Sequence, residues 1–161
     1  FTVFDLMTFD RNWGRFGVGI SGTLPTGADG LTLDKWTAGP ALGFVNSSVK
    51  KVNWGLFAQT FFSYAGDDDA PDVGIINLQP VLSYQLGKGR SLSVGNSALV
   101  YDTERSRWSS LLVSVNYGFV VGWAGQKWRP NFEVGYDFKD DPGNQEWVLR
   151  AGVALLVPAA R

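Results

Sequence analysis

An acidic run between residues 66 and 72 is the densest group of side chains that could do chemistry. Four carboxylates fall within six residues: Asp67, Asp68, Asp69 and Asp72. Calcium accepts oxygen ligands in flexible numbers, so the run predicts a Ca²⁺ site, although its spacing is not that of an EF-hand. The alternative is a solvated acidic turn whose shape is set by Gly66 and Pro71.

A second group consists of charged residues expected on one face of the predicted strands: Arg15, Glu133, Asp137 and Arg150. If 131–138 and 147–157 form a hairpin around 139–146, Arg150 lies opposite Gly135 and diagonal to both carboxylates. In a narrow interior these charges should pair as a structural network. In a wider pore they would instead form a selectivity constriction.

Four amide side chains are predicted to share that face: Gln59, Asn77, Gln79 and Gln85. They either line a path for polar solutes or hydrogen-bond to one another inside a packed barrel.

Enzymatic chemistry has little support in the composition. The chain has no His and no Cys, which removes Ser–His and Cys–His catalysis, disulfides and thiolate metal sites. It also contains no GxSxG, P-loop or dinucleotide motif. We therefore expect no enzyme and no cofactor apart from Ca²⁺ at the acidic run, where an Asp-based hydrolase is the one enzymatic alternative. The net charge of -1 gives no basic field for nucleic acid.

Period-two alternation of apolar and polar residues predicts the elements that position these groups. In 131–138, for example, Phe132, Val134 and Tyr136 alternate with Glu133 and Asp137. The clearest strands are 13–24, 74–86, 131–138 and 147–157; noisier ones are 36–45, 53–64, 91–101 and 108–121, and 1–9 is a weaker ninth. No run of about 18 apolar residues predicts a transmembrane helix.

Many of these segments are longer than the strands of soluble sheets, and their polar face is mostly small or uncharged. Both features favour an all-β fold: one domain over 1–161, an antiparallel up-and-down transmembrane β-barrel with about eight to ten strands in this chain, either as a whole barrel or as the C-terminal part of a larger one. The alternative is a soluble β-sandwich or a lipocalin-like barrel. The barrel implies a bacterial outer membrane, with the lipid bilayer and a small solute as partners; a partner protein or a homo-oligomer stays open.

The linkers between strands sort by charge. They are 10–12, 25–35, 46–52, 65–72, 87–90, 102–107, 122–129 and 139–146. Every second linker is acidic, with Asp29, Asp34, Asp67, Asp68, Asp69, Asp72, Asp102, Glu104, Asp140, Asp141 and Glu146. The other set has one acid, Asp10, and the bases Arg11, Lys50, Lys51, Lys88, Arg90, Lys127 and Arg129. If the last strand ends in the periplasm, the acidic linkers face the cell exterior.

Aromatic residues are expected in two bands, one near each set of linkers. Trp13, Trp54, Trp123 and Trp128 fall near the basic linkers, and Trp36, Tyr64, Tyr101, Trp108 and Trp147 fall near the acidic ones. Amphipathic rings are favoured at the headgroup level of a bilayer, so the bands fit two interfacial girdles.

Several runs carry a family resemblance: 13–26, 35–41, 62–73, 78–86 and 146–150, with the Ala65–Val73 run as the most specific. They resemble the outer-membrane barrels labelled transporter-like or MetA-pathway phenol-degradation proteins, sometimes misnamed neuromedin U. The resemblance implies porin-like passage of small, often hydrophobic solutes in Gram-negative bacteria. The alternative is a structural or interaction barrel without an open pore, whose acidic loops bind cations or a partner.

The number of predicted strands departs from the usual bacterial pattern. Nine candidates are odd, whereas single-chain bacterial barrels have an even number. Members of the family are also usually longer, with strands before the point where this chain begins. We therefore expect either that N-terminal strands are missing or that 1–9 plugs or caps the barrel.

Overall fold

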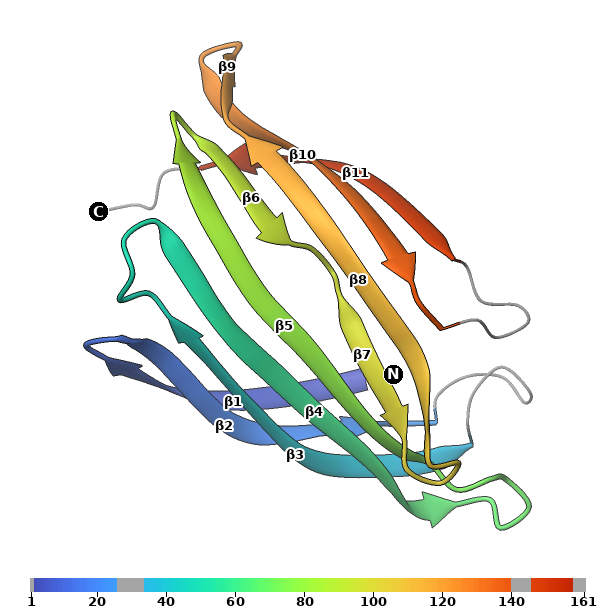
Figure 1. The fold of residues 1–161 in the computed structure, drawn as a ribbon. Coiled ribbons are helices and arrows are strands. Elements are labelled where there is room, and N and C mark those ends of the chain that lie inside the picture. The colour runs from blue at the N-terminus through green and yellow to red at the C-terminus, as the bar shows by residue number, and fades with distance from the viewer. Residues whose placement is uncertain (1, 26–33, 140–145, 158–161) are drawn as a thin grey trace.

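The structure is a computed structural model, which describes residues 2–25, 34–139 and 146–157. Every regular element in these described ranges is a strand (Figure 1). They are β1 (Thr2–Arg11), β2 (Gly14–Thr23), β3 (Lys35–Asn46), β4 (Val52–Gly66), β5 (Gly74–Gly87), β6 (Arg90–Val94), β7 (Ala98–Asp102), β8 (Arg107–Phe119), β9 (Val121–Trp123), β10 (Gln126–Asp137) and β11 (Trp147–Leu156). The described residues contain no helix long and apolar enough to cross a membrane.

All strands belong to one antiparallel sheet, so the all-β, up-and-down part of the prediction is confirmed. The main path runs β1-β2-β3-β4-β5-β6-β8-β10-β11. β7 continues the course of β6 between β5 and β8, and β9 pairs with the start of β10. The prediction of one strand over 91–101 is wrong, because β6 and β7 are separated at Gly95–Ser97.

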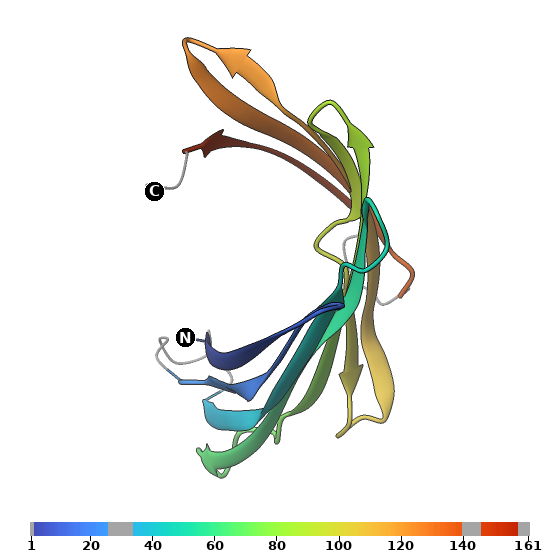
Figure 2. The same ribbon diagram turned by 90° about the vertical axis from the view of Figure 1, so that its left-hand side faces the viewer.

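The sheet curves strongly and stays open (Figure 2). β1 and β11 form its two edges and do not pair within the described residues, so these residues do not form a closed barrel. Nine strands lie on the path, and each is antiparallel to its neighbour. The two edge strands therefore run in the same direction.

Tight turns join the strands at one end of the sheet (Figure 1). Lys88–Gly89 and Ala124–Gly125 both have two consecutive residues at positive φ, the pattern of two-residue type I′ hairpins. Most connections at the opposite end are longer, as after β2, β4 and β10. The predicted alternation of linkers between two ends is thus confirmed.

Acidic and basic residues are less completely separated between the two ends of the sheet than the positions of the acids alone suggest. The acidic end also carries bases: Lys35, Arg105, Arg107 and Lys139. Arg105 forms an ion pair with Asp102 at 2.7 Å, and the Lys35 ammonium lies 3.4 Å from Asp72. Asp29, Asp140 and Asp141 lie outside the described residues.

The two faces of the sheet have opposite chemistry. Large apolar side chains on one face are exposed, including Ile20 at 69 % and Leu149 at 78 %. The other face carries the buried polar residues: Ser21, Thr37, Gln59, Ser91, Ser97, Asp102, Ser114, Glu133 and Asp137. Among described residues only Ala41 and Val73 are buried hydrophobics. Since no second sheet covers either face, burial of the polar side chains comes from curvature, which places them on the concave side.

Candidate functional site: the concave face

The main polar cluster on the concave face is centred on Glu133 of β10. Its Oε1 lies 2.7 Å from Arg150 Nη1 and accepts hydrogen bonds from Ser114 Oγ at 2.9 Å and the Asn96 amide N–H at 3.0 Å. Its Oε2 accepts from Asn96 Nδ2, also at 3.0 Å. The Glu133 residue is only 5 % exposed, so four donors compensate for loss of water around the carboxylate.

The pairing of β10 with β11 explains the ion pair and corrects its predicted register. Arg150 lies directly opposite Glu133, and Gly135 lies opposite Val148. The prediction that Arg150 faces Gly135 is wrong by two residues. β10 ends at Asp137, so Tyr136 rather than Phe138 pairs with Trp147.

Asp137 does not join this ion pair. Its carboxylate accepts hydrogen bonds from Ser110 Oγ at 2.7 Å, the Leu111 amide at 2.8 Å and the Lys139 amide at 3.0 Å. Asp137 therefore satisfies backbone donors where β10 ends beside β8, and its observed contacts are structural.

Arg15 is far from the Glu133 cluster along the sheet. It lies on β2 and binds Asp10 of β1 through an Nε–Oδ1 contact of 2.6 Å, with both side chains exposed. The four predicted charged residues therefore divide into one pair, Glu133 with Arg150, and two separate sites.

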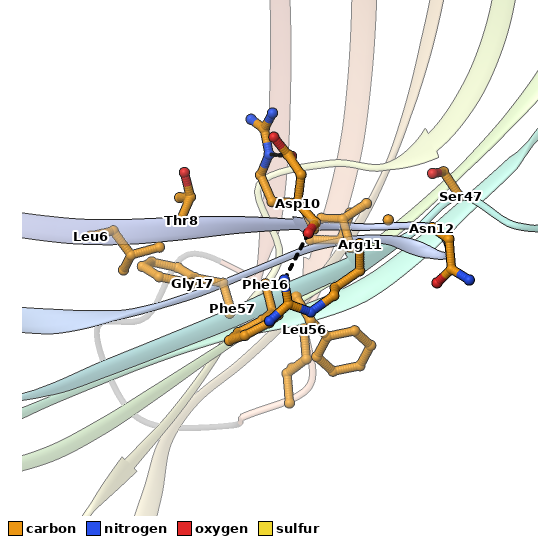
Figure 3. A pocket seen from close by; sticks show the side chains of 16 residues that line it. Leu6, Thr8, Asp10, Arg11, Asn12, Phe16, Gly17, Ser47, Leu56 and Phe57 are labelled. Atoms are coloured by element: carbon orange, nitrogen blue, oxygen red, sulfur yellow. Dashed lines mark hydrogen bonds and ion pairs between the residues drawn. The ribbon is translucent and has the colours of Figure 1, made fainter.

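The Asp10–Arg15 pair borders a hollow of about 650 Å³ at the basic end of the concave face (Figure 3). Leu6 and Phe57 contribute apolar surface to it. A Cβ at Gly17 would lie 2.3 Å from the Leu6 side chain, so glycine allows Leu6 to lie across β2. The hollow thus combines an apolar lining with charges at its border.

The predicted amides lie on the same face but only two of them meet. Gln59 of β4 is directly opposite Asn77 of β5, whereas Gln79 faces Phe57 and Gln85 faces Ser91. The Asn77 Oδ1 is buried without a hydrogen-bond partner. The amides form a discontinuous row, and neither predicted role is decided by their positions.

The acidic run forms the turn between β4 and β5. Asp67 Oδ1 accepts the Asp69 amide at 3.0 Å, while Asp72 binds Ser63 Oγ at 3.1 Å and lies near Lys35. No three carboxylates gather within the described part of the chain. These contacts are those of a structured turn, and the Ca²⁺ site stays a prediction without geometric support.

Residues missed by sequence reasoning are the neutral partners of Glu133. Asn96 and Ser114 are ordinary polar residues in the sequence, and Asn96 reaches Glu133 from 37 positions away. Gly95-Asn96-Ser97 did carry a signal, since turn-forming residues inside an apolar run favour a break or bulge.

No protein-family model, curated protein or solved structure matches this chain.

Proposed function

We propose that the curved sheet is the wall of a transmembrane β-barrel in a bacterial outer membrane, and that its concave face lines a passive route for small solutes. The observation that carries this proposal is the inverted burial. Apolar side chains cover most of the convex face without any protein against them, although Asp5 of the edge strand β1 lies on this face opposite Ile20, and polar side chains are buried on the concave face. Such a largely apolar surface requires an apolar partner, and lipid provides one on every side of a barrel.

Strand length supports the same assignment. β4, β5 and β8 have 15, 14 and 13 residues, more than the roughly 9–11 residues that a tilted strand needs to cross a bilayer.

The two aromatic bands also support the proposal of a transmembrane barrel. Trp123 and Trp128 contact each other near one end of the sheet, and Tyr101 and Trp108 do so near the other. We assign the end with the acidic connections to the cell exterior.

The solute is proposed to be small and partly apolar. The concave face offers Leu6 and Phe57 in one half and the Glu133 cluster in the other. A route with both kinds of surface suits amphipathic molecules, in keeping with the solutes implied by the resemblance to MetA-pathway barrels.

Single-cysteine labelling tests which face meets lipid, because the chain contains no Cys. Leu149 projects from the convex face, and its neighbour Val148, opposite Gly135, projects from the concave face. In lipid vesicles, an environment-sensitive fluorophore on Leu149→Cys should be shifted to the blue and protected from iodide. The matched Val148→Cys label should stay accessible to iodide. Equal iodide quenching at both positions would contradict the proposal.

The competing proposal is a barrel without an open pore. The packed contacts of Glu133 favour it, because side chains fill the interior of narrow barrels. Planar-bilayer recordings separate the two. In an open pore, Arg150→Ala should change the current or the ion selectivity, because it leaves the Glu133 carboxylate unpaired. A wild-type chain that inserts without conducting ions would favour the barrel without an open pore.

A further inference from the structure

The course of the chain between β5 and β8 is interrupted at Gly95–Ser97. β5 pairs with β6 up to Ser83–Ser93 and with β7 from Leu78–Leu99. Among the described residues, no ladder pair joins the intervening 79–82 segment of β5 to that side. The register shifts by one residue across the break, both toward β5 and toward β8. One extra residue is therefore accommodated there, as in a β-bulge.

The extra residue is drawn to the concave side, where the 95–97 segment projects in Figure 2. Asn96 binds Glu133 through its amide N–H and its side chain, and Ser97 Oγ accepts the Ser114 amide at 2.8 Å. The Gly95 position has no room for a side chain, since a Cβ would lie 2.6 Å from the Glu133 carboxyl carbon. The Glu133 cluster thus holds the segment away from β5.

A cavity of about 240 Å³ occupies the space left between β5 and this segment. Its lining includes Gln79 and Val81, which face the concave side, and Pro80 and Leu82, which face the convex side. Because residues from both faces of one strand line it, the cavity lies in the plane of the sheet. A buried cavity of about 150 Å³ can hold benzene, so this space is large enough for a one-ring molecule.

We propose that this gap is a lateral opening through which a small, largely apolar solute passes between the concave face and the surrounding lipid. The proposal rests on the transmembrane function proposed above. Unpaired backbone groups are costly where they face hydrocarbon, and they are tolerated where they are buried in protein or line a water-filled cavity. The serines and amides at the break provide that polar lining, while Pro80, Val81 and Leu82 provide apolar contact.

Deleting Asn96 tests the opening, because removing one residue brings β7 into the register of β6 toward β5 and, over Ala98–Val100, toward β8, and should seal the wall. Cells of a Gram-negative host carrying the chain in their outer membrane are mixed with N-phenyl-1-naphthylamine, which fluoresces on entering a bilayer. The wild-type chain should accelerate dye entry, and the deletion should reduce it to the rate of cells lacking the chain. Ion conductance of the purified protein should remain.

A second variant tests the opening without deleting a residue, so that the test does not depend on folding of the Asn96 deletion. Ser93→Trp places a large ring in the cavity while leaving the Glu133 contacts intact, and it should also abolish dye entry. Gln85→Trp adds the same ring to the concave face outside the cavity and should not.

Three outcomes count against the opening. Dye entry at the wild-type rate through inserted Ser93→Trp would overturn it. Loss of both dye entry and conductance in that variant would also overturn it, since the ring would then block the lumen. A wild-type chain that inserts and conducts but does not accelerate dye entry would overturn the opening alone. Failure of the wild-type chain to insert would instead contradict the transmembrane function.

Discussion

At the scale of single residues, Glu133 is a charged side chain that the fold removes almost completely from water. A carboxylate that is almost fully buried needs its donors, and Arg150, Ser114 and Asn96 supply them from three other segments. Removing it leaves a guanidinium and several polar groups without their acceptor.

We predict that Glu133→Ala lowers the free energy of unfolding by about 2–3 kcal/mol, less than a fully buried pair because Arg150 is partly exposed. Urea titration of the protein in lipid vesicles, followed by tryptophan fluorescence, measures this loss. Asp10→Ala is the matched control, since it breaks an exposed pair with Arg15 and should change stability little. Equal effects of the two substitutions would refute the special role of Glu133.

Asp137 supports a prediction about local order. Its carboxylate accepts the Leu111 and Lys139 amides, so Asp137→Ala should speed hydrogen exchange at both. Amides in the middle of β4 should keep their protection. Deuterium uptake measured by mass spectrometry provides the comparison, and unchanged uptake around residue 111 would show that these hydrogen bonds contribute nothing.

The sequence predicted which charged residues share a face but not which of them meet. Alternation along 131–138 and 147–157 is enough to place Glu133 and Arg150 on the same side. Their direct pairing depends on where β10 ends, and Asp137 helps to define that end through bonds to residues distant in sequence. Register across a long connection is therefore not encoded locally.

At the scale of elements, glycines on the concave face allow the strands to bend. A Cβ at Gly39 of β3 would lie 2.3 Å from Thr60 Oγ1 and 2.4 Å from the Thr60 carbonyl oxygen. Beside it, Ser21 Oγ of β2 reaches across β3 to donate a hydrogen bond to that same carbonyl at 2.9 Å. Close approach of β2 and β4 thus depends on the missing side chain.

We predict that Gly39→Val destabilises the folded sheet by about 2 kcal/mol or more, because the valine would force β3 and β4 apart. The fraction that keeps its compact mobility on unheated SDS gels should fall. Gly122→Val is the control, since a Cβ there meets nothing within 4 Å. A Gly39→Val protein as stable as the control would mean that curvature does not depend on this contact.

Strand boundaries were largely predictable because period-two alternation follows directly from strand geometry. The break at 95–97 was missed for a physical reason. Leu92 and Val94 before it and Leu99 and Tyr101 after it are all large apolar or aromatic residues, so the segment resembles one noisy strand although its alternation changes phase by one residue. The contact that holds Asn96 out of the strand comes from Glu133 on β10. The turn-forming residues 95–97 favour a break, but only the contact of Asn96 with Glu133 shows that the extra residue lies on the concave side.

At the scale of the whole molecule, the described residues form a sheet path of nine strands with free edges at β1 and β11. β1 and β11 run in the same direction, so direct closure between them would be a parallel pairing. A sheet closed by antiparallel pairs alone has an even number of strands, so closure would take an odd number of additional strands. The additional strands that pair with β1 and β11 would run from the basic end to the acidic end. Free edges expose backbone donors and acceptors that are costly in lipid.

This geometry predicts the exchange behaviour of the chain in detergent micelles. Every second amide of β1 and β11, those pointing away from β2 and β10, should exchange rapidly, while both sets of amides in β4 and β5 are protected. NMR-detected exchange on the isolated chain resolves the two sets. Protection of all amides in β1 and β11 would mean that the edges are already paired. A disulfide between Met7→Cys and Val153→Cys would then identify the partner of the two edges. A disulfide within one chain would mean that β1 and β11 pair directly in parallel, and a disulfide between two chains would mean that the edges pair with a second copy. Rapid exchange at alternate amides, without crosslinks, is the result expected of an open sheet whose two edge strands have no partner on their outer side.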